Sequence, residues 1–204
     1  MAVRVKICGL TRPGDVAAAV DAGADALGFV FAPRSKRCLE LPEAFELVSA
    51  VPAFIARVGL FMDQDEDEVR RVLDAVPLSL LQFHGSEAGR FCRQFGLPYI
   101  KALAMGSGGR AEGVEAYSDA AALMLDSHEA GEPGGTGHVF DWNRIPALPR
   151  PLVLAGGLSP DNVNRAVRQV RPWAVDVSSG VEKEPGVKSA RKMNEFISEA
   201  KRED

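Results

Sequence analysis

The sequence predicts an α/β protein folded as a single (β/α)8 barrel, or TIM barrel, that spans residues 1–204. Short apolar and β-branched runs alternate with amphipathic stretches eight times along the chain. The strand-like runs are apolar almost throughout, which is typical of parallel strands that are buried on both faces. The length of 204 residues lies near the lower limit for this fold, and no linker or change of composition indicates a second domain.

Eight runs are predicted strands because they are short, apolar and bounded by Gly, Pro, Asp or Ser. They are Val3–Ile7, Ala26–Phe31, Phe54–Phe61, Ser79–Phe83, Tyr99–Ala104, Ala121–Asp126, Leu152–Ala155 and Ala174–Val177. Amphipathic stretches after these runs are predicted helices. They are Pro13–Ala22, Pro42–Val51, Asp65–Ala75, Ser86–Phe95, approximately Gly113–Tyr117, Pro160–Val170 and approximately Lys188–Lys201.

Several of these helices carry a signal at their start. Acidic residues occupy the predicted first turns at Asp65 and Glu87, and Ser159 is a candidate N-cap followed by Pro160. The fifth unit is the weakest, because a glycine-rich segment precedes a short helix. Alternating strands and helices of this number favour a closed barrel over an open doubly wound sheet.

The charge and hydropathy of the chain exclude several kinds of partner. The formal net charge is −4, so we expect no overall basic surface that would attract nucleic acid or an anionic membrane. No apolar run reaches the roughly 20 residues of a membrane span, and the N-terminus lacks the layout of a signal peptide. We therefore expect a cytoplasmic protein with neither membrane nor nucleic acid as a partner.

The cysteines and histidines indicate neither disulfides nor a metal site. The three cysteines form neither an even set nor a CxxC pair, and the three histidines are widely separated without ligand spacing. These residues are Cys8, Cys38, Cys92, His84, His128 and His138.

Polar side chains share one face of four predicted strands and gather near the C-terminal strand ends. Residues two apart on a strand point the same way. The pairs are Lys6 with Cys8, Gln82 with His84, Met124 with Asp126, and Asp176 with Ser178. A single polar residue at a strand end is more often a structural group, but agreement among four strands predicts an active site at this end of the barrel.

Glycine-rich loops follow the last two predicted strands. Such loops let backbone N–H groups approach a ligand, and the loops after strands seven and eight are the usual phosphate site of barrel enzymes. A Gly-Gly pair alone would also suit a tight turn. We expect the phosphate-binding residues to be Gly156, Gly157, Ser178, Ser179 and Gly180.

Together these segments resemble the phosphoribosylanthranilate isomerase family. The matching motifs run in order along nearly the whole chain. They are Lys6–Thr11, Gly28–Phe31 with Ser35–Arg37, Gln82–Gly85, Gly134–Gly137 with Phe140–Trp142, Leu154–Leu158 and Val175–Glu182.

The resemblance implies one reaction and the roles of several residues. The reaction is the Amadori rearrangement of N-(5-phosphoribosyl)anthranilate, a step of tryptophan biosynthesis that uses no cofactor. The resemblance makes Cys8 the general base, Asp126 the general acid and Arg37 the partner of the anthranilate carboxylate. Gln82 and His84 are expected to bind substrate, with His84 a hydrogen-bonding group rather than a proton carrier.

The proton transfers set requirements for the two catalytic groups. An ordinary thiol has a pKa near 8.5, so Cys8 needs positive neighbours or helix dipoles that favour its thiolate. Asp126 must hold a proton near neutral pH, which burial or a nearby negative charge can arrange. From its strand position alone, Cys8 could equally be a small buried apolar residue.

Two other kinds of function compete with this interpretation. Another phosphosugar barrel enzyme, such as a related sugar isomerase or indole-glycerol-phosphate synthase, would typically use paired aspartates or lysines with a glutamate. A non-catalytic sensor of a phosphorylated ligand would keep the glycine loops without needing Cys8. Activity on a related aminoaldose phosphate stays open, as does the choice between monomer and homodimer.

Charged residues are also predicted inside the barrel below the site. Strand parity places four charged side chains there. Lys6 shares the parity of Cys8 and Asp176 that of Ser178, Arg57 points inward if Phe61 does, and Lys101 matches Leu103. Buried charges require partners, so we expect Asp176 to bridge at least one of the cations and the surplus positive charge to act on Cys8. Alternatively, one or two of the cations reach solvent at the lower rim.

Overall fold

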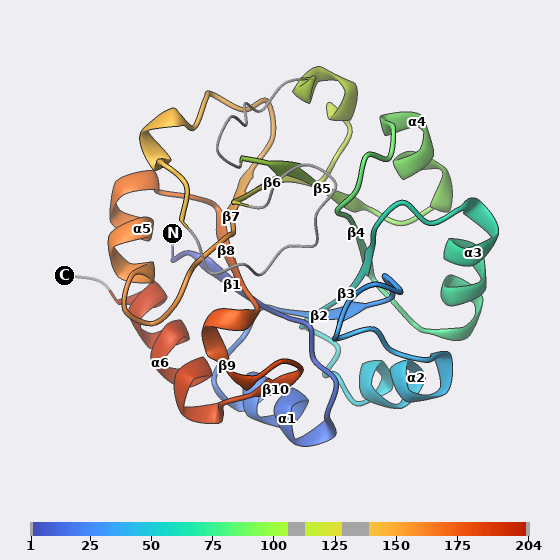
Figure 1. Cartoon of the computed structure of the whole chain (residues 1–204), viewed down its shortest axis with the longest axis horizontal. Coiled ribbons are helices and arrows are strands. Elements are labelled where there is room, and N and C mark those ends of the chain that lie inside the picture. Colours follow the sequence, from blue (N-terminus) through green and yellow to red (C-terminus); the bar gives the residue numbers. More distant parts are fainter. Residues whose placement is uncertain (1, 106–112, 128–138, 203–204) are drawn as a thin grey trace.

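The computed structural model describes residues 2–105, 113–127 and 139–202. Eight parallel strands close into a barrel in sequential order, β1 to β8, with β8 pairing back onto β1 (Figure 1). The predicted fold class is therefore confirmed. Among the described residues, the helices are too short or too polar to cross a membrane.

The barrel strands lie within two residues of their predicted bounds. They are β1 Arg4–Cys8, β2 Ala26–Val30, β3 Ala56–Phe61, β4 Leu80–Phe83, β5 Tyr99–Ala104, β6 Ala122–Asp126, β7 Leu152–Leu154 and β8 Ala174–Val177.

The α-helices form a layer outside the barrel, and short 3-10 helices cover the remaining positions. The α-helices are α1 Pro13–Asp21, α2 Leu41–Ser49, α3 Glu66–Ala75, α4 Gly89–Cys92, α5 Val163–Val170 and α6 Ala190–Lys201. The 3-10 helices are η1 Arg93–Phe95, η2 Val114–Tyr117, η3 Trp142–Arg144 and η4 Ser179–Val181. A hairpin of β9 Glu182–Glu184 and β10 Val187–Lys188 precedes α6.

Three helix starts differ from the prediction. Ser159 does not cap α5, since its backbone N–H binds the Asn162 carboxamide and the helix begins only at Val163. The helix predicted from Ser86 begins at Gly89, because the Glu87 carboxylate accepts the N–H groups of Gly85 and of Asp63 in the loop after β3. Lys188 belongs to β10 rather than to α6. The start at Asp65 is as predicted, with a full capping box.

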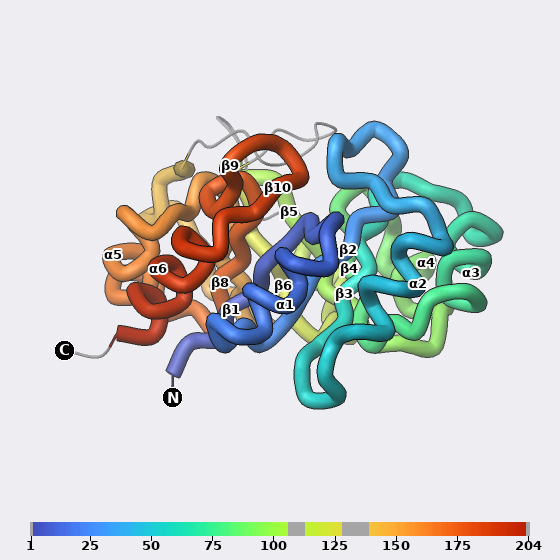
Figure 2. Tube along the Cα trace, turned by 90° about the horizontal axis from the view of Figure 1, so that it is seen from below, coloured from blue at the N-terminus to red at the C-terminus, as the bar shows by residue number. Residues whose placement is uncertain are grey.

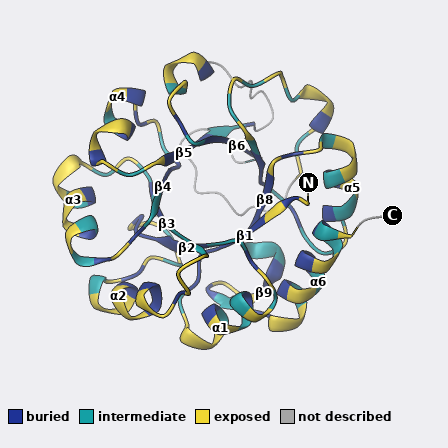
Figure 3. Ribbon diagram, turned by 180° about the vertical axis from the view of Figure 1, so that it is seen from behind, coloured by how far each residue is buried: buried dark blue, intermediate teal, exposed yellow. Residues whose placement is uncertain are grey.

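Two apolar layers lie on opposite sides of the barrel wall. The larger layer fills the space between strands and helices, and the helices are buried on their inward faces and exposed outside (Figure 3). The smaller layer lies inside the barrel. Its members are Ile100, Ala102, Ala122, Met124, Val153, Ala155 and Ala174.

The prediction of four inward charges below the site was half wrong. Phe61 packs in the outer layer and stacks on Phe31 with ring centroids 5.4 Å apart, so Arg57 of the same strand also faces outward. Lys101 pairs in register with the outward-facing Phe83. Only Lys6 and Asp176 meet inside the barrel, where Nζ lies 2.7 Å from Oδ1.

The loops that follow the strands gather at one end of the barrel. Figure 2 shows the β9–β10 hairpin and the loop after β2 along this edge, with the N-terminus at the opposite edge. This arrangement collects side chains from distant parts of the chain around one opening.

Candidate active site

A cavity of about 510 Å³ opens at the C-terminal ends of the strands, a volume typical of small-molecule sites. Seven residues predicted from the sequence line it: Cys8, Arg37, Gln82, His84, Asp126, Ser178 and Ser179. Gly156, Gly157 and Gly180 belong to the loops around the cavity without being part of its lining. Apolar side chains of β2, β3 and the loop after β3 complete one wall, namely Val30, Leu60 and Met62.

Cys8 ends β1 and is only 4% exposed. Its position depends on the neighbouring strand, where Gly28 pairs with it in register. A Cβ atom on Gly28 would lie 2.7 Å from Sγ of Cys8, closer than carbon and sulfur can pack. Glycine at position 28 therefore makes the space in which the thiol lies.

The thiol lies above the buried Lys6–Asp176 pair. Burial raises the pKa of Cys8, while the charge of Lys6 opposes this shift and Asp176 adds to it; the net direction is upward. Burial lowers the pKa of Lys6, but Asp176 and Cys8 outweigh it and raise the value overall. The expected positive neighbour of Cys8 is present, but Asp176 offsets part of its charge.

Gln82, His84 and Asp126 form the opposite wall. Nε2 of Gln82 lies 3.0 Å from Nδ1 of His84, and Nε2 of His84 lies 3.8 Å from Oδ2 of Asp126. With the amide N–H donating to Nδ1, the ring N–H lies on Nε2, which faces Asp126. All three side chains are buried.

Arg37 is held by the carboxylate of Glu182, the last residue of the Val175–Glu182 motif. Its Nε and Nη2 atoms each lie 2.7 Å from an oxygen of Glu182. Glu182 also accepts from the buried Lys188, whose Nζ lies 2.8 Å from Oε1. Burial acts to raise the pKa of Glu182, but the bonds from these two cations lower it overall.

Lys188 reaches into the same cluster from the β9–β10 hairpin. Its ammonium also donates to the carbonyl of Ser178 at 3.1 Å. Burial lowers the pKa of Lys188, and Glu182 only partly opposes this. Sequence reasoning missed Lys188 because the run around it was interpreted as the start of a helix. For Glu182, the carboxylate partner of Lys188, the sequence signal was its place in the Val175–Glu182 motif.

The two glycine loops touch each other at the rim. Gly156 and Gly157 have φ angles of +83° and +63°, which favour glycine. The Asn162 side chain secures this loop by donating to the Gly157 carbonyl at 2.9 Å. A Cβ atom on Gly180 would collide with the carbonyl oxygen of Leu158, so the loop after β8 packs directly on the loop after β7.

The described residues contain no cluster of three or more His, Cys, Asp or Glu side chains that could hold a metal ion. The loop after β6 was matched to the family by Gly134–Gly137 and by Phe140–Trp142. The first of these motifs lies outside the described residues.

Residues 5–199 match the family model described as N-(5'-phosphoribosyl)anthranilate (PRA) isomerase. The chain belongs to this family. A Thiobacillus denitrificans PRA isomerase is 54% identical, with 98% of this chain and 99% of the relative covered. A Pseudomonas aeruginosa PRA isomerase is 52% identical, with 96% of this chain and 94% of the relative covered.

Solved PRA isomerases share the fold. The Thermotoga maritima structure has a TM-score of 0.85 at 39% identity and covers 98% of both chains. The Thermus thermophilus structure has a TM-score of 0.86 at 38% identity and covers 97% of this chain and 98% of its own. A further PRA isomerase, with a TM-score of 0.81 at 37% identity and 98% of both chains covered, is in complex with reduced 1-(o-carboxyphenylamino)-1-deoxyribulose 5-phosphate.

Proposed function

We propose that this PRA isomerase converts N-(5-phosphoribosyl)anthranilate to 1-(2-carboxyphenylamino)-1-deoxyribulose 5-phosphate in tryptophan biosynthesis, with Cys8 as general base and Asp126 as general acid. The observation that carries the residue roles is that Cys8, Asp126, Arg37 and the Ser178–Ser179 loop line one cavity. The relative solved with a reduced carboxyphenylamino-deoxyribulose phosphate supports the substrate class.

Asp126 acts first, by protonating the furanose ring oxygen. This opens the ring and leaves a Schiff base between the sugar and the anthranilate nitrogen. His84 faces the carboxyl group across 3.8 Å, so it can hold Asp126 in position without carrying the proton itself. A placed acid of this kind accelerates a reaction by roughly 10²–10⁴-fold.

Cys8 then removes the proton from C2′, which gives an enolamine that tautomerises to the ketone. Lys6 provides the positive charge that favours the thiolate, against the burial that raises the pKa of the thiol. Because the two catalytic groups come from β1 and β6, on different sides of the barrel, the sugar lies between its acid and its base.

The two ends of the substrate have separate anchors in this proposal. Arg37 binds the anthranilate carboxylate through Nη1 and the free edge of Nη2, since Nε and the other edge of Nη2 face Glu182. The phosphate binds backbone N–H groups of Gly157, Ser179 and Gly180. Gln82 and His84 contact the sugar between these two anchors.

The proposed chemistry uses no cofactor, and the substrate is the principal partner. A phosphorylated sugar does not cross membranes unaided, so we propose that the enzyme acts in the cytoplasm where its substrate is made. The chain works as a monomer or a homodimer; a Thermotoga maritima relative of 36% identity was solved as monomers generated from a dimeric isomerase.

The test is turnover of substrate generated in situ, followed by the change in anthranilate fluorescence. Wild-type protein should convert it, whereas Cys8→Ser and Asp126→Asn should each lose roughly 10²–10⁴-fold in kcat with unchanged circular dichroism. Near-normal turnover in either variant removes that residue from the mechanism. Binding without turnover by the wild type favours the sensor alternative, and preference for another aminoaldose phosphate corrects the substrate.

A further inference from the structure

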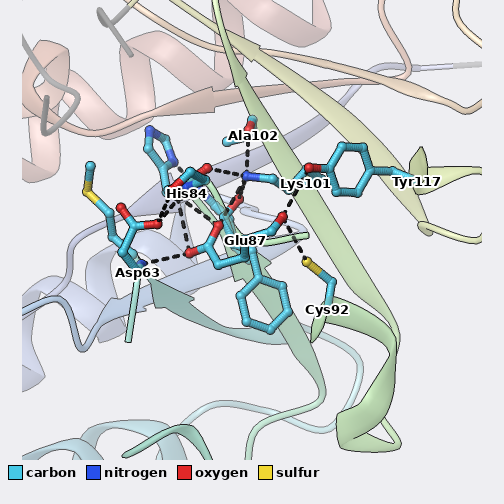
Figure 4. A network of polar contacts seen from close by, with 12 residues as sticks. Asp63, His84, Glu87, Cys92, Lys101, Ala102 and Tyr117 are labelled. Carbon is cyan, nitrogen blue, oxygen red and sulfur yellow. Dashed lines mark hydrogen bonds and ion pairs between the residues drawn. The ribbon is translucent and has the colours of Figure 1, made fainter. Parts of the chain in front are cut away.

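The loop that carries His84 is anchored from behind by a buried ion pair. Lys101 lies on the outward face of β5, beside Phe83 of β4. Its Nζ lies 3.1 Å from Oε2 of Glu87, and both side chains are no more than 3% exposed. The pair lies behind the barrel wall, away from the cavity lining, and the mechanism above does not use it (Figure 4).

Lys101 also donates to backbone carbonyls, two of which flank His84. The ammonium donates to Phe83 O at 3.3 Å and Ala102 O at 3.1 Å, and it also donates to Gly85 O. The carbonyls before and after His84 are therefore held by one cation. An ammonium has three protons, so its hydrogen-bonding capacity is filled by this loop, its own strand and Glu87.

Glu87 holds the same loop through its N–H groups. Its carboxylate accepts from Gly85 N at 3.0 Å and from Asp63 N at 2.9 Å. Gly85 is thus fixed at both its N–H and its carbonyl. The backbone N–H of His84 donates to Phe61 O at 2.8 Å, which completes the attachment of this segment.

The loop after β3 is tied into the same unit. Oδ1 of Asp63 accepts from Ser86 N at 2.7 Å and from Ser86 Oγ at 2.8 Å. A Cβ atom on Gly85 would lie inside the Asp63 carboxylate, so only glycine permits this approach. The loop that presents Met62 to the cavity and the loop that presents His84 are therefore joined by hydrogen bonds.

We infer that the Lys101–Glu87 pair is a positioning device for the isomerase reaction, which sets the backbone of Phe83–Gly85 and thereby the approach of His84 to Asp126. The inference rests on the proposed function. Neither residue touches substrate in this assignment. Their effect passes through the His84 side chain, whose Nε2 faces the catalytic carboxyl group.

The distribution of contacts distinguishes this role from simple stabilisation of the helix layer. The two side chains bond to backbone groups of residues 63–85 and to the carbonyl of Ala102 next to Lys101. The backbone carbonyl of Glu87 accepts from Sγ of Cys92 at 3.8 Å. Tyr117 also donates to the Glu87 carbonyl at 3.0 Å, and its ring lies 5.7 Å from Nζ of Lys101. The helix layer thus closes over the pair, while the bonds of the pair itself point at the loops.

The experiment removes both charges together, because breaking a buried pair by removing one partner leaves an uncompensated charge. The variant is Lys101→Met with Glu87→Gln, which keeps the side-chain volumes and an oxygen that accepts from Gly85. We expect kcat to fall roughly 10–100-fold, the scale of a small misplacement of a catalytic group, with KM changed less than about threefold. KM should change little because the residues that bind the substrate's carboxylate and phosphate lie on other loops.

A second readout follows His84 directly. The imidazole proton resonances, assigned by their loss in His84→Gln, should shift or broaden in the double variant of the folded full chain. The matched control is Asp119→Asn. Asp119 pairs with Arg93 at 3.0 Å and accepts from Tyr99 at 2.7 Å on the same side of the barrel, so its loss should leave both kcat and the His84 signals unchanged.

Two outcomes would overturn the inference. One is a folded double variant with kcat within twofold of wild type and unshifted His84 resonances. The other is an equal loss of activity in Asp119→Asn, which would show that any weakening of this side of the barrel has the same effect. If the double variant does not fold, Glu87→Asp decides by the same kcat, KM and resonance criteria, because it keeps the charge and withdraws the carboxylate from the Gly85 N–H. Failure of the proposed function itself is distinguishable, because wild-type protein would then show no turnover.

Discussion

The thiol of Cys8 lies in the space that a side chain on Gly28, its partner in register on β2, would need. A Cβ atom at position 28 would lie 2.7 Å from Sγ, 3.0 Å from Cα of Cys8 and 3.1 Å from Cε of Lys6. Because Gly28 has no Cβ, there is room both for the proposed base, Cys8, and for the Lys6 side chain beneath it. The φ angle of Gly28 is not in the left-handed region, so the requirement concerns space rather than backbone conformation.

We predict that Gly28→Ala lowers kcat by roughly 10²-fold, because the methyl group displaces the thiol from the C2′ proton. Overpacking should cost about 1–3 kcal/mol of unfolding free energy. Steady-state kinetics and urea denaturation measure the two effects. The matched control is Gly14→Ala in α1, where nothing lies within 4 Å of the added Cβ and no loss of activity is expected. Normal kcat in a folded Gly28→Ala variant would show that Cys8 tolerates the displacement or is not the base.

A second prediction concerns the charges around the thiol. Cys8 faces Lys6 on its own strand, Asp176 on β8, Lys188 on β10 and Arg37 after β2. Burial is the largest cause of its raised pKa, Lys6 and Lys188 lower the value, and Asp176 adds to the rise. Asp176→Asn removes the negative charge and leaves an oxygen that can still accept from Lys6.

The pKa of Cys8 should therefore fall in Asp176→Asn. A base acts in its deprotonated form, so the limb of kcat/KM that rises with pH should move to lower pH. Thiol alkylation against pH, carried out in a Cys38→Ser background to remove the exposed cysteine, reports the same pKa independently. A limb that stays in place, or moves to higher pH, would rule out this electrostatic account.

The barrel was predictable because its signals are local. Strand alternation placed Cys8, Gln82, Asp126 and Ser178 on one face, and all four line the cavity. Which side chains of a given strand face the barrel interior was harder to predict. Phe61 suits either apolar layer, and taking it as inward turned Arg57 the wrong way. Lys101 was placed by its parity with Leu103, which also packs in the outer layer.

The missed parts of the site depend on contacts between distant residues. The β9–β10 hairpin is short and highly charged, so no apolar alternation marks it as strand, and Lys188 becomes interpretable only beside Glu182. Glu87 looked like an acidic residue of a helix start. Its actual partners, Asp63 N–H, Gly85 N–H and Lys101, come from two loops and a strand.

Glu182 should act on substrate affinity through Arg37. We predict that Glu182→Gln raises KM about tenfold with a smaller change in kcat, because the guanidinium loses one of the charge-assisted bonds, worth roughly 1.5–3 kcal/mol, that orient it toward the anthranilate carboxylate. Arg37→Ala should raise KM at least as much. The matched control is Glu195→Gln, whose carboxylate lies 2.8 Å from Arg191 on the exposed face of α6, away from the cavity. Equal KM values for Glu182→Gln and wild type would show that Arg37 needs no orienting carboxylate, and an unchanged KM in Arg37→Ala would remove Arg37 from carboxylate binding.

Inorganic phosphate should compete with substrate at the two glycine loops. The backbone of Gly180 packs on the Leu158 carbonyl, so Gly180→Ala must push the loops after β7 and β8 apart. We predict that this variant raises KM for substrate and the inhibition constant for phosphate in parallel, with kcat affected less, since the N–H groups that bind the anion separate while Cys8 and Asp126 stay in place. Gly14→Ala again controls for a methyl group added to a glycine elsewhere. Crystals soaked in sulfate should hold the anion at the N–H groups of Gly157, Ser179 and Gly180. Non-competitive inhibition by phosphate, or a sulfate bound elsewhere with this position empty, would place the phosphate site outside these loops.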